Sequence, residues 1–99
     1  MFKAQLVGVY TVRDMPDELR PFVNLEARRR KRELRMDDKF IALQIEGTLS
    51  YLTFFLDTIS SVSQLEAELR EQECELTPVS KASIQKVIEH HRPSGTRQK

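Results

Sequence analysis

The chain has 99 residues, of which 39% are hydrophobic and 31% are charged, and its formal net charge is +1 at pH 7. This length allows one domain with one modest core, and the patterned hydrophobic residues favour a folded chain over a disordered one. The best apolar run, residues 49–56, spans about eight residues where a membrane span needs about twenty, so no membrane protein is expected. The single cysteine, Cys74, excludes an internal disulfide framework. Together with an N-terminus that lacks a signal-peptide pattern, it predicts a cytoplasmic protein.

Residues 2–13 alternate in a pattern that predicts a β-strand. The alternation places five apolar residues on one face of this strand: Phe2, Ala4, Leu6, Tyr10 and Val12. Val7 and Val9 fall on the opposite face, which predicts that the middle of the strand is covered on both sides. Asp14 and Pro16 then favour a short helix, because proline suits a first helical turn.

A second helix is expected from Phe22 to about Met36, and its later part is strongly basic. Residues 28–35 hold six cations and one anion. Because an unpaired charge is costly to bury, this run must face water, a phosphate backbone or an acidic protein surface. We therefore expect a partner-binding surface formed by Arg28, Arg29, Arg30, Lys31, Arg32 and Arg35.

In a continuous helix Arg28, Arg32 and Arg35 would share one face, with Arg29 adjoining. Because residues 27–34 hold no apolar side chain beyond Ala27 and Leu34, this segment either projects from the body or forms an ordered, exposed turn. The alternative to partner contact is a solvated segment whose charge is balanced internally by Asp37, Asp38 or the glutamates of residues 66–75.

Residues 39–46 and 50–57 predict two strands that form a hairpin. The first segment alternates, the second is rich in aromatic residues and threonine, and Gly47-Thr48 between them is a turn signal. Apolar residues spaced three or four apart leave one long helix over residues 48–74 as an alternative. The poor helix formers of residues 58–61 disfavour that helix.

Two helices are expected at the C-terminal end. Ser61 and Gln64 form a capping-box pattern that starts a helix over residues 62–74, whose exposed faces are acidic. Thr77 and Pro78 start a second helix over residues 78–91. The predicted fold is a small α+β domain over residues 1–92, with about three strands and two to three helices, followed by a flexible basic tail, residues 93–99.

Residues 77–89 resemble the start of the recognition helix in LacI-type helix-turn-helix regulators. The residues at the corresponding positions are Val79, Ser80, Ser83, Ile84 and Val87. This resemblance implies a nucleic-acid-binding surface made by Ser80, Lys81, Ser83, Gln85 and Lys86. An ordinary capped amphipathic helix accounts for the same residues.

No catalytic, metal-binding or cofactor-binding pattern is present in the sequence. The three glycines, at positions 8, 47 and 95, are too scattered for a phosphate-binding loop. His90 and His91 diverge by about 100° on a helix and cannot ligate one metal there. Cys74 lies between Glu73 and Glu75, which should raise its pKa and leave an inert thiol.

We therefore expect a non-catalytic intracellular binding protein, of the small bacterial or phage accessory or inhibitor type. It would dock through a cationic helix on a larger host protein, for example one that processes nucleic acid. The alternative is a nucleic-acid-binding regulator that uses the helix-turn-helix-like segment and the basic run. No cofactor, small-molecule substrate or membrane is expected, and a homodimer, with residues 49–56 as its seam, remains open.

Overall fold

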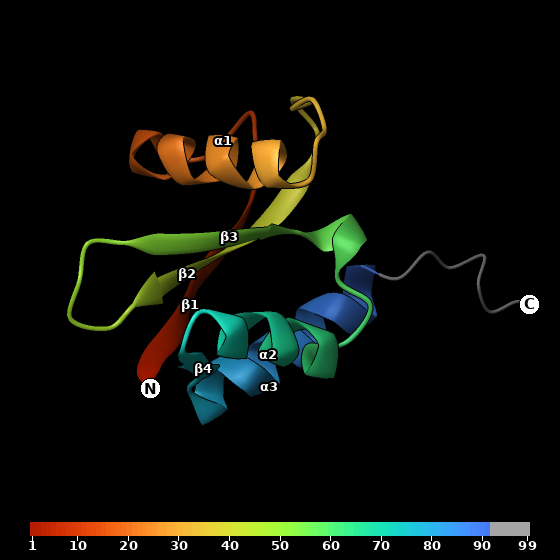
Figure 1. Ribbon diagram of the computed structural model, residues 1–99. Helices are drawn as coiled ribbons and strands as arrows, with labels where there is room; N and C mark the ends of the chain where they lie inside the picture. Colours follow the sequence, from red (N-terminus) through yellow and green to blue (C-terminus); the bar gives the residue numbers. More distant parts are fainter. Residues whose placement is uncertain (92–99) are drawn as a thin grey trace, which may run out of the picture.

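The structure, a computed structural model, describes residues 1–91 and contains a single four-stranded sheet within them (Figure 1). The strands are β1 (Phe2–Thr11), β2 (Lys39–Ile45), β3 (Tyr51–Phe55) and β4 (Cys74–Leu76), in the spatial order β3-β2-β1-β4. β1, β2 and β3 are antiparallel, whereas β4 pairs with β1 in parallel. The predicted basic tail, residues 93–99, lies outside the described residues.

Three α-helices cover the two faces of this sheet. α1 (Arg20–Arg29) lies on one face, and α2 (Val62–Glu71) and α3 (Pro78–His91) lie on the other (Figure 1). Two short 3-10 turns, Asp17–Leu19 and Leu56–Thr58, lead into α1 and out of β3. The α+β fold is confirmed, with four strands rather than about three. None of the helices in residues 1–91 is long and apolar enough to cross a membrane.

A β-bulge at Val7 turns the alternation of β1 over. Before the bulge Leu6 lies opposite Leu43 of β2, and after it Gly8 lies opposite Ala42. Side chains of a strand point alternately to its two faces, and the bulge adds one extra residue to β1. Even-numbered residues therefore point to one face before the bulge and to the other face after it. Ala4 and Leu6 pack under α2 and α3, whereas Tyr10 and Val12 pack under α1. The prediction of one common face was therefore wrong, as was the covered middle, since Val7 and Val9 are 44% and 40% exposed.

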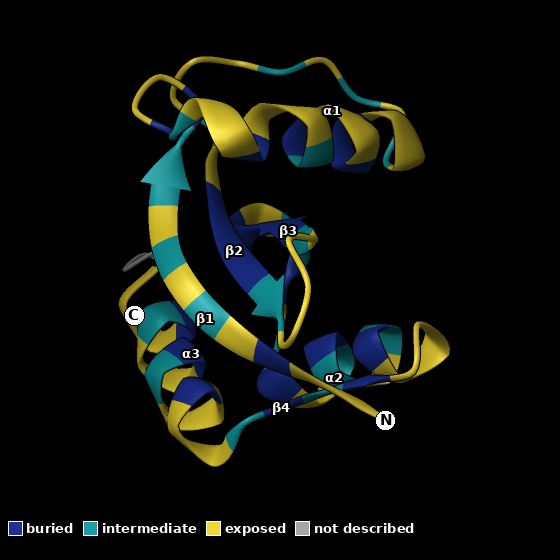
Figure 2. Cartoon of the chain, turned by 90° about the vertical axis from the view of Figure 1, so that its left-hand side faces the viewer, coloured by how far each residue is buried: buried dark blue, intermediate teal, exposed yellow. Residues whose placement is uncertain are grey.

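The bulge gives the domain two cores on opposite faces of the sheet. The larger core lies beneath α2 and α3, and its fully buried members include Ile41, Leu43, Leu65, Leu69 and Ile84. The smaller core lies beneath α1 and includes Leu19, Val23, Phe40 and Phe55. Figure 2 shows the strongly curved sheet between them, with β2 coloured as buried over most of its length.

The hairpin and the two C-terminal helices form where the sequence predicts them. β2 and β3 pair antiparallel from Phe40–Phe55 to Gln44–Tyr51, which excludes one long helix over residues 48–74. Ser61 caps α2 by accepting a hydrogen bond from the Gln64 backbone N–H at 3.1 Å. The Gln64 side chain accepts in turn from the Ser60 N–H at 2.6 Å, one residue before the cap.

Candidate protein-docking surface

The basic run begins as helix and continues as a turn. α1 ends at Arg29, and Lys31 has a left-handed backbone with φ of 56°. The Arg32 N–H donates to the Ala27 carbonyl and the Lys31 N–H donates to the Arg28 carbonyl, a hydrogen-bond pattern that closes helix C-termini. The helix to Met36 was therefore wrong, and Arg32 and Arg35 do not share a helix face with Arg28. Of the two arrangements considered, the ordered exposed turn is the one observed.

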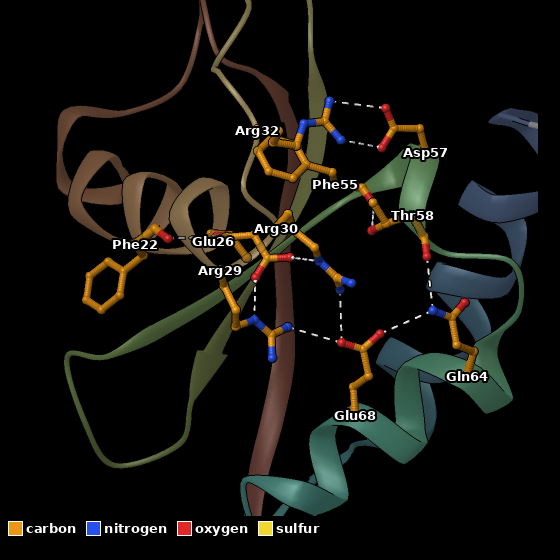
Figure 3. Close-up of polar contacts among 11 residues, drawn as sticks. Phe22, Glu26, Arg29, Arg30, Arg32, Phe55, Asp57, Thr58, Gln64 and Glu68 are labelled. Carbon is orange, nitrogen blue, oxygen red and sulfur yellow. Dashed lines mark hydrogen bonds and ion pairs between the residues drawn. The ribbon is translucent and has the colours of Figure 1, made fainter.

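Two arginines of this run join carboxylates from opposite sides of the sheet (Figure 3). Glu26 of α1, 6% exposed, accepts from Arg29 Nε at 3.1 Å and from Arg30 Nε at 2.8 Å. The other ends of both guanidinium groups donate to Glu68 of α2, at 3.1 and 2.9 Å. The hydrogen bond to Glu26 is the main reason that the pKa of Arg30 is raised. These four contacts, which we call the arginine clasp, join α1 to α2 around the outer strand β3.

Arg32 is held by a second set of contacts at the far end of β3 (Figure 3). Its guanidinium donates to both carboxylate oxygens of Asp57, at 2.8 and 3.2 Å, and to Asp38 at 3.0 Å. It also lies over the Phe55 ring, 4.1 Å from the centroid, in a cation–π contact. The bond to Asp57 is the main cause of its raised pKa. Three of the six cations of the run are thus balanced within the fold.

The remaining cations of the run, Arg28, Lys31 and Arg35, are exposed and have no ion-pair partner within residues 1–91. Arg28 lies one turn along α1 from Leu25, an apolar side chain that is 58% exposed. Met36, 55% exposed, follows Arg35. Exposed apolar side chains next to unpaired cations make a surface that suits an acidic and apolar partner.

A groove of about 240 Å³ runs beside this surface, between α1 and β3. Phe22 and Leu25 form one wall, with Glu26 and Arg29, and Gln72 lies beyond the end of α2. Residues 51–54 of β3 form the floor, where the Phe22 and Tyr51 rings meet edge to face at 5.5 Å. Thr53 fixes the floor to α1 by donating its hydroxyl hydrogen bond to the Phe22 carbonyl at 3.1 Å. The groove is mostly apolar, with a cation at its rim.

β3 is an edge strand, and its side away from β2 borders this groove except where the contacts of Arg29 and Arg30 with Glu68 pass around it. The Ile45 N–H donates to the Ser50 carbonyl, which sets the pairs 43–52 and 41–54 as the hydrogen-bonded ones. The backbone groups of Tyr51 and Thr53 therefore point away from β2. The sequence predicts this strand, but the groove was missed, because its walls come from segments about thirty residues apart.

The segment that resembles a recognition helix has a different setting in the structure. α2 and α3 flank strand β4 and pack on the same sheet face, so they do not form a helix-turn-helix. Ser80 is buried, and its hydroxyl oxygen accepts from the Leu6 N–H at 2.8 Å, which contradicts its predicted place in a DNA groove. Lys81 pairs with Glu66 at 3.4 Å, and Ser83 is half-buried. Gln85 and Lys86 are exposed, with Gln85 bonded to Glu89.

Among residues 1–91 the structure has no group of three or more His, Cys, Asp or Glu side chains that could hold a metal ion. Cys74 is 2% exposed, and burial, followed by the charge of Glu73, raises the pKa of its thiol. The raised pKa that the acidic neighbours predict is therefore found, with burial as its larger cause.

The sequence of this chain matches a protein-family model over residues 2–88, and that family is described as a domain of unknown function, DUF749. The chain belongs to the DUF749 family. A relative in Methanocaldococcus jannaschii, described as uncharacterized protein MJ0858, is 32% identical over 92 residues, which cover 92% of this chain and 81% of the relative. No solved structure matches the chain. All four strands of the fold, and both sides of the groove, lie within the DUF749 match.

Proposed function

We propose that this chain is a non-catalytic, cytoplasmic accessory protein that binds an extended segment of a larger protein along β3, at the part of its outer edge that the Arg29 and Arg30 contacts with Glu68 leave open. The observation that carries the proposal is the apolar groove beside that edge, with Leu25 in its wall and the unpaired Arg28 one helical turn further along α1. Extended peptides add to free sheet edges through backbone hydrogen bonds, and pockets beside the edge select their side chains.

The chemistry of the groove defines the partner segment. Its apolar walls, Phe22 and Leu25, suit one large apolar side chain of the segment. Arg28 and Lys31, which have no carboxylate partner within residues 1–91, suit acidic residues next to that side chain. The proposed ligand is therefore an extended stretch with an apolar residue flanked by aspartate or glutamate. Binding would occlude that stretch from other partners of the larger protein, as expected of an accessory or inhibitor protein.

The arginine clasp supports this proposal by keeping the groove in shape. Glu26 and Arg29 line the groove and are fixed by the contacts that also reach Arg30 and Glu68. A surface held in its binding geometry loses less conformational entropy when a ligand binds. In this reading the basic run has two roles, since Arg29, Arg30 and Arg32 build the wall while Arg28, Lys31 and Arg35 face the partner.

Peptide selection followed by calorimetry tests the proposal. The wild-type chain selects ligands from a random-peptide display library, and affinities of the synthetic peptides are then measured by titration. We expect an apolar residue with acidic neighbours in the selected peptides, and about tenfold weaker binding by Arg28→Glu and by Leu25→Glu, or about 1.4 kcal/mol each. Lys86→Glu on α3, a charge reversal at another exposed cation, should bind like the wild type.

The backbone contact has its own readout in amide exchange. A strand added to β3 should slow hydrogen exchange at the Thr53 N–H, which points away from β2. Selected peptides without acidic residues would contradict the proposal. Peptides that bind Arg28→Glu and Leu25→Glu as tightly as the wild type, and that do not slow exchange at the Thr53 N–H, would also contradict it.

The alternative proposal is a nucleic-acid-binding regulator, favoured by the same three unpaired cations. Phosphate contacts release counterions, so binding to duplex DNA would weaken steeply with salt. Replacing Arg28, Lys31 and Arg35 by alanine should then flatten the plot of log affinity against log salt. Tight duplex binding by the wild-type chain at physiological salt, with a slope that depends on these residues, would replace the protein-binding proposal.

A further inference from the structure

The second edge of the sheet, formed by β4 and by the second half of β1, differs from the β3 edge in its hydrogen bonding and in its charge. β4 pairs only with Phe2–Ala4 of β1, and the Leu6 N–H is taken by the Ser80 hydroxyl. Beyond this point, residues 7–11 of β1 have no strand partner on the β4 side within the described part of the chain, and residues 8–11 pair with β2 on the other side. Figure 2 shows this half of β1 running to its arrowhead beyond β4.

The backbone of this free stretch is oriented for pairing. The Val12 N–H donates to the Asp38 carbonyl, so the pairs 12–38, 10–40 and 8–42 are the hydrogen-bonded ones. The backbone groups of Val9 and Thr11 therefore point away from β2. Among residues 1–91 the carbonyl of Thr11 accepts from the Asp14 N–H, and no hydrogen bond from outside the sheet reaches Val9.

The side chains of this stretch lack most of the devices that protect edge strands. Residues 4–12 contain no charged residue and no proline, and two of the exposed side chains are the β-branched Val7 and Val9. Free edges in folded proteins are usually blocked by charges, proline or bulges, and the one bulge here lies at Val7, the first residue of the free stretch. The β3 edge, in contrast, is crossed by the contacts of Arg29 and Arg30 with Glu68, so only part of it is open to a second copy.

We infer that β1 pairs with β1 of a second copy of this chain, antiparallel about a two-fold axis at Val9. In this register residues 7–11 of one copy lie opposite residues 11–7 of the other, so the whole free stretch is used. Val9 then donates to and accepts from Val9 of the second copy, and Val7 lies opposite Thr11. Sliding the strands by two residues would leave part of the edge unpaired or bring it against β4.

Self-pairing suits this edge because its uncharged side chains cause no repulsion between identical strands. The result would be one continuous eight-stranded sheet in the dimer, with the β3 edge and its groove at each outer end. This inference does not rest on the proposed function, since it uses the opposite edge of the sheet.

Sedimentation velocity over a range of concentrations tests the dimer with two matched valine variants. The wild-type chain should reach twice its mass of 11.6 kDa. Val9→Lys places like charges opposite each other at the axis and should raise the dissociation constant at least about tenfold. Val79→Lys is the control, because Val79 is 79% exposed on α3 and should leave the dimer intact. Circular dichroism would establish that both variants are folded.

Amide exchange then assigns the interface. The Val9 and Thr11 amides should exchange slowly in the dimer and faster in Val9→Lys. A monomeric wild-type chain would overturn the inference, as would a dimer that Val9→Lys leaves unchanged or in which these two amides exchange freely. A chain that dimerises only after residues 92–99 are removed would assign the edge to those residues instead and would also overturn it.

Discussion

Arg29 Nη2 of α1 and Glu68 Oε1 of α2 lie 3.1 Å apart, although the two helices cover opposite faces of the sheet. The contact passes around β3, the outer strand of the sheet. The basic run, residues 28–35, predicts a surface for an external partner, but some of its arginines instead join the two helical layers of the domain.

Glu26→Ala should lower the free energy of unfolding by about 1–2 kcal/mol, because Arg29 and Arg30 lose a buried common acceptor. The loss is smaller than for a fully buried ion pair, since both guanidinium groups keep contact with water. Urea denaturation measures it. Glu33→Ala, an exposed acid in the same run, is the control and should be neutral. Equal stabilities of the two variants would show that the clasp contributes nothing.

Ser80→Ala should destabilise the domain by about 1–3 kcal/mol, because the Leu6 N–H beside the bulge would lose its acceptor. The Thr77 hydroxyl would lose its acceptor as well, since it donates to Ser80 Oγ at 2.8 Å. Thermal unfolding of Ser80→Ala and of Ser83→Ala, a half-buried serine of the same helix, tests this assignment. A Ser80→Ala variant as stable as the wild type would contradict the structural role given to this hydroxyl.

The Lys3–Glu75 ion pair predicts a local pH dependence at the β1–β4 contact. A hydrogen bond from Lys3 holds the pKa of Glu75 below its ordinary value of 4.5. A carboxylate with a lowered pKa stabilises the fold above its unfolded-state pKa, and this contribution is lost as pH falls through the folded-state pKa. Lys3→Ala should raise the pKa of Glu75 towards 4.5 in an NMR titration of the carboxyl carbon. Lys39→Ala, on a distant part of the sheet, should leave that titration unchanged.

The Cys74 thiol should be nearly unreactive in the folded chain. It is 2% exposed, and its pKa is raised first by burial and then by the charge of Glu73. Because the thiolate is the reactive form, a disulfide reagent at mildly alkaline pH should modify it only as fast as the domain opens. Adding urea below the unfolding midpoint should accelerate the reaction. Rapid modification without denaturant would show that the thiol is accessible in the native state.

The elements that the sequence predicts well are those with local signals. The turn at Gly47-Thr48, the Ser61 cap and the Thr77-Pro78 start each act within a few residues of the element that they define. Their boundaries in the structure lie within a few residues of the predicted ones. Local chemistry is sufficient in these segments because nothing distant competes with it.

The remaining features depend on contacts that no local pattern encodes. β4 has three residues and exists because Phe2–Ala4 provides a partner strand. The pairing of Arg29 with Glu68 joins residues 39 positions apart. The contact between Glu26 and Arg30, in contrast, has the i, i+4 spacing of helical ion pairs, so this contact is predictable from the sequence.

Because of the bulge at Val7, the two halves of β1 pack in different cores. The first half packs in the core beneath α2 and α3, and the second half packs in the core beneath α1. Losing a single residue there would rotate one half of the strand by 180° and exchange the side chains offered to the two cores. The length of this segment is therefore as constrained as its composition. Insertions and deletions should be tolerated instead in the β2–β3 loop, where Leu49 is 87% exposed.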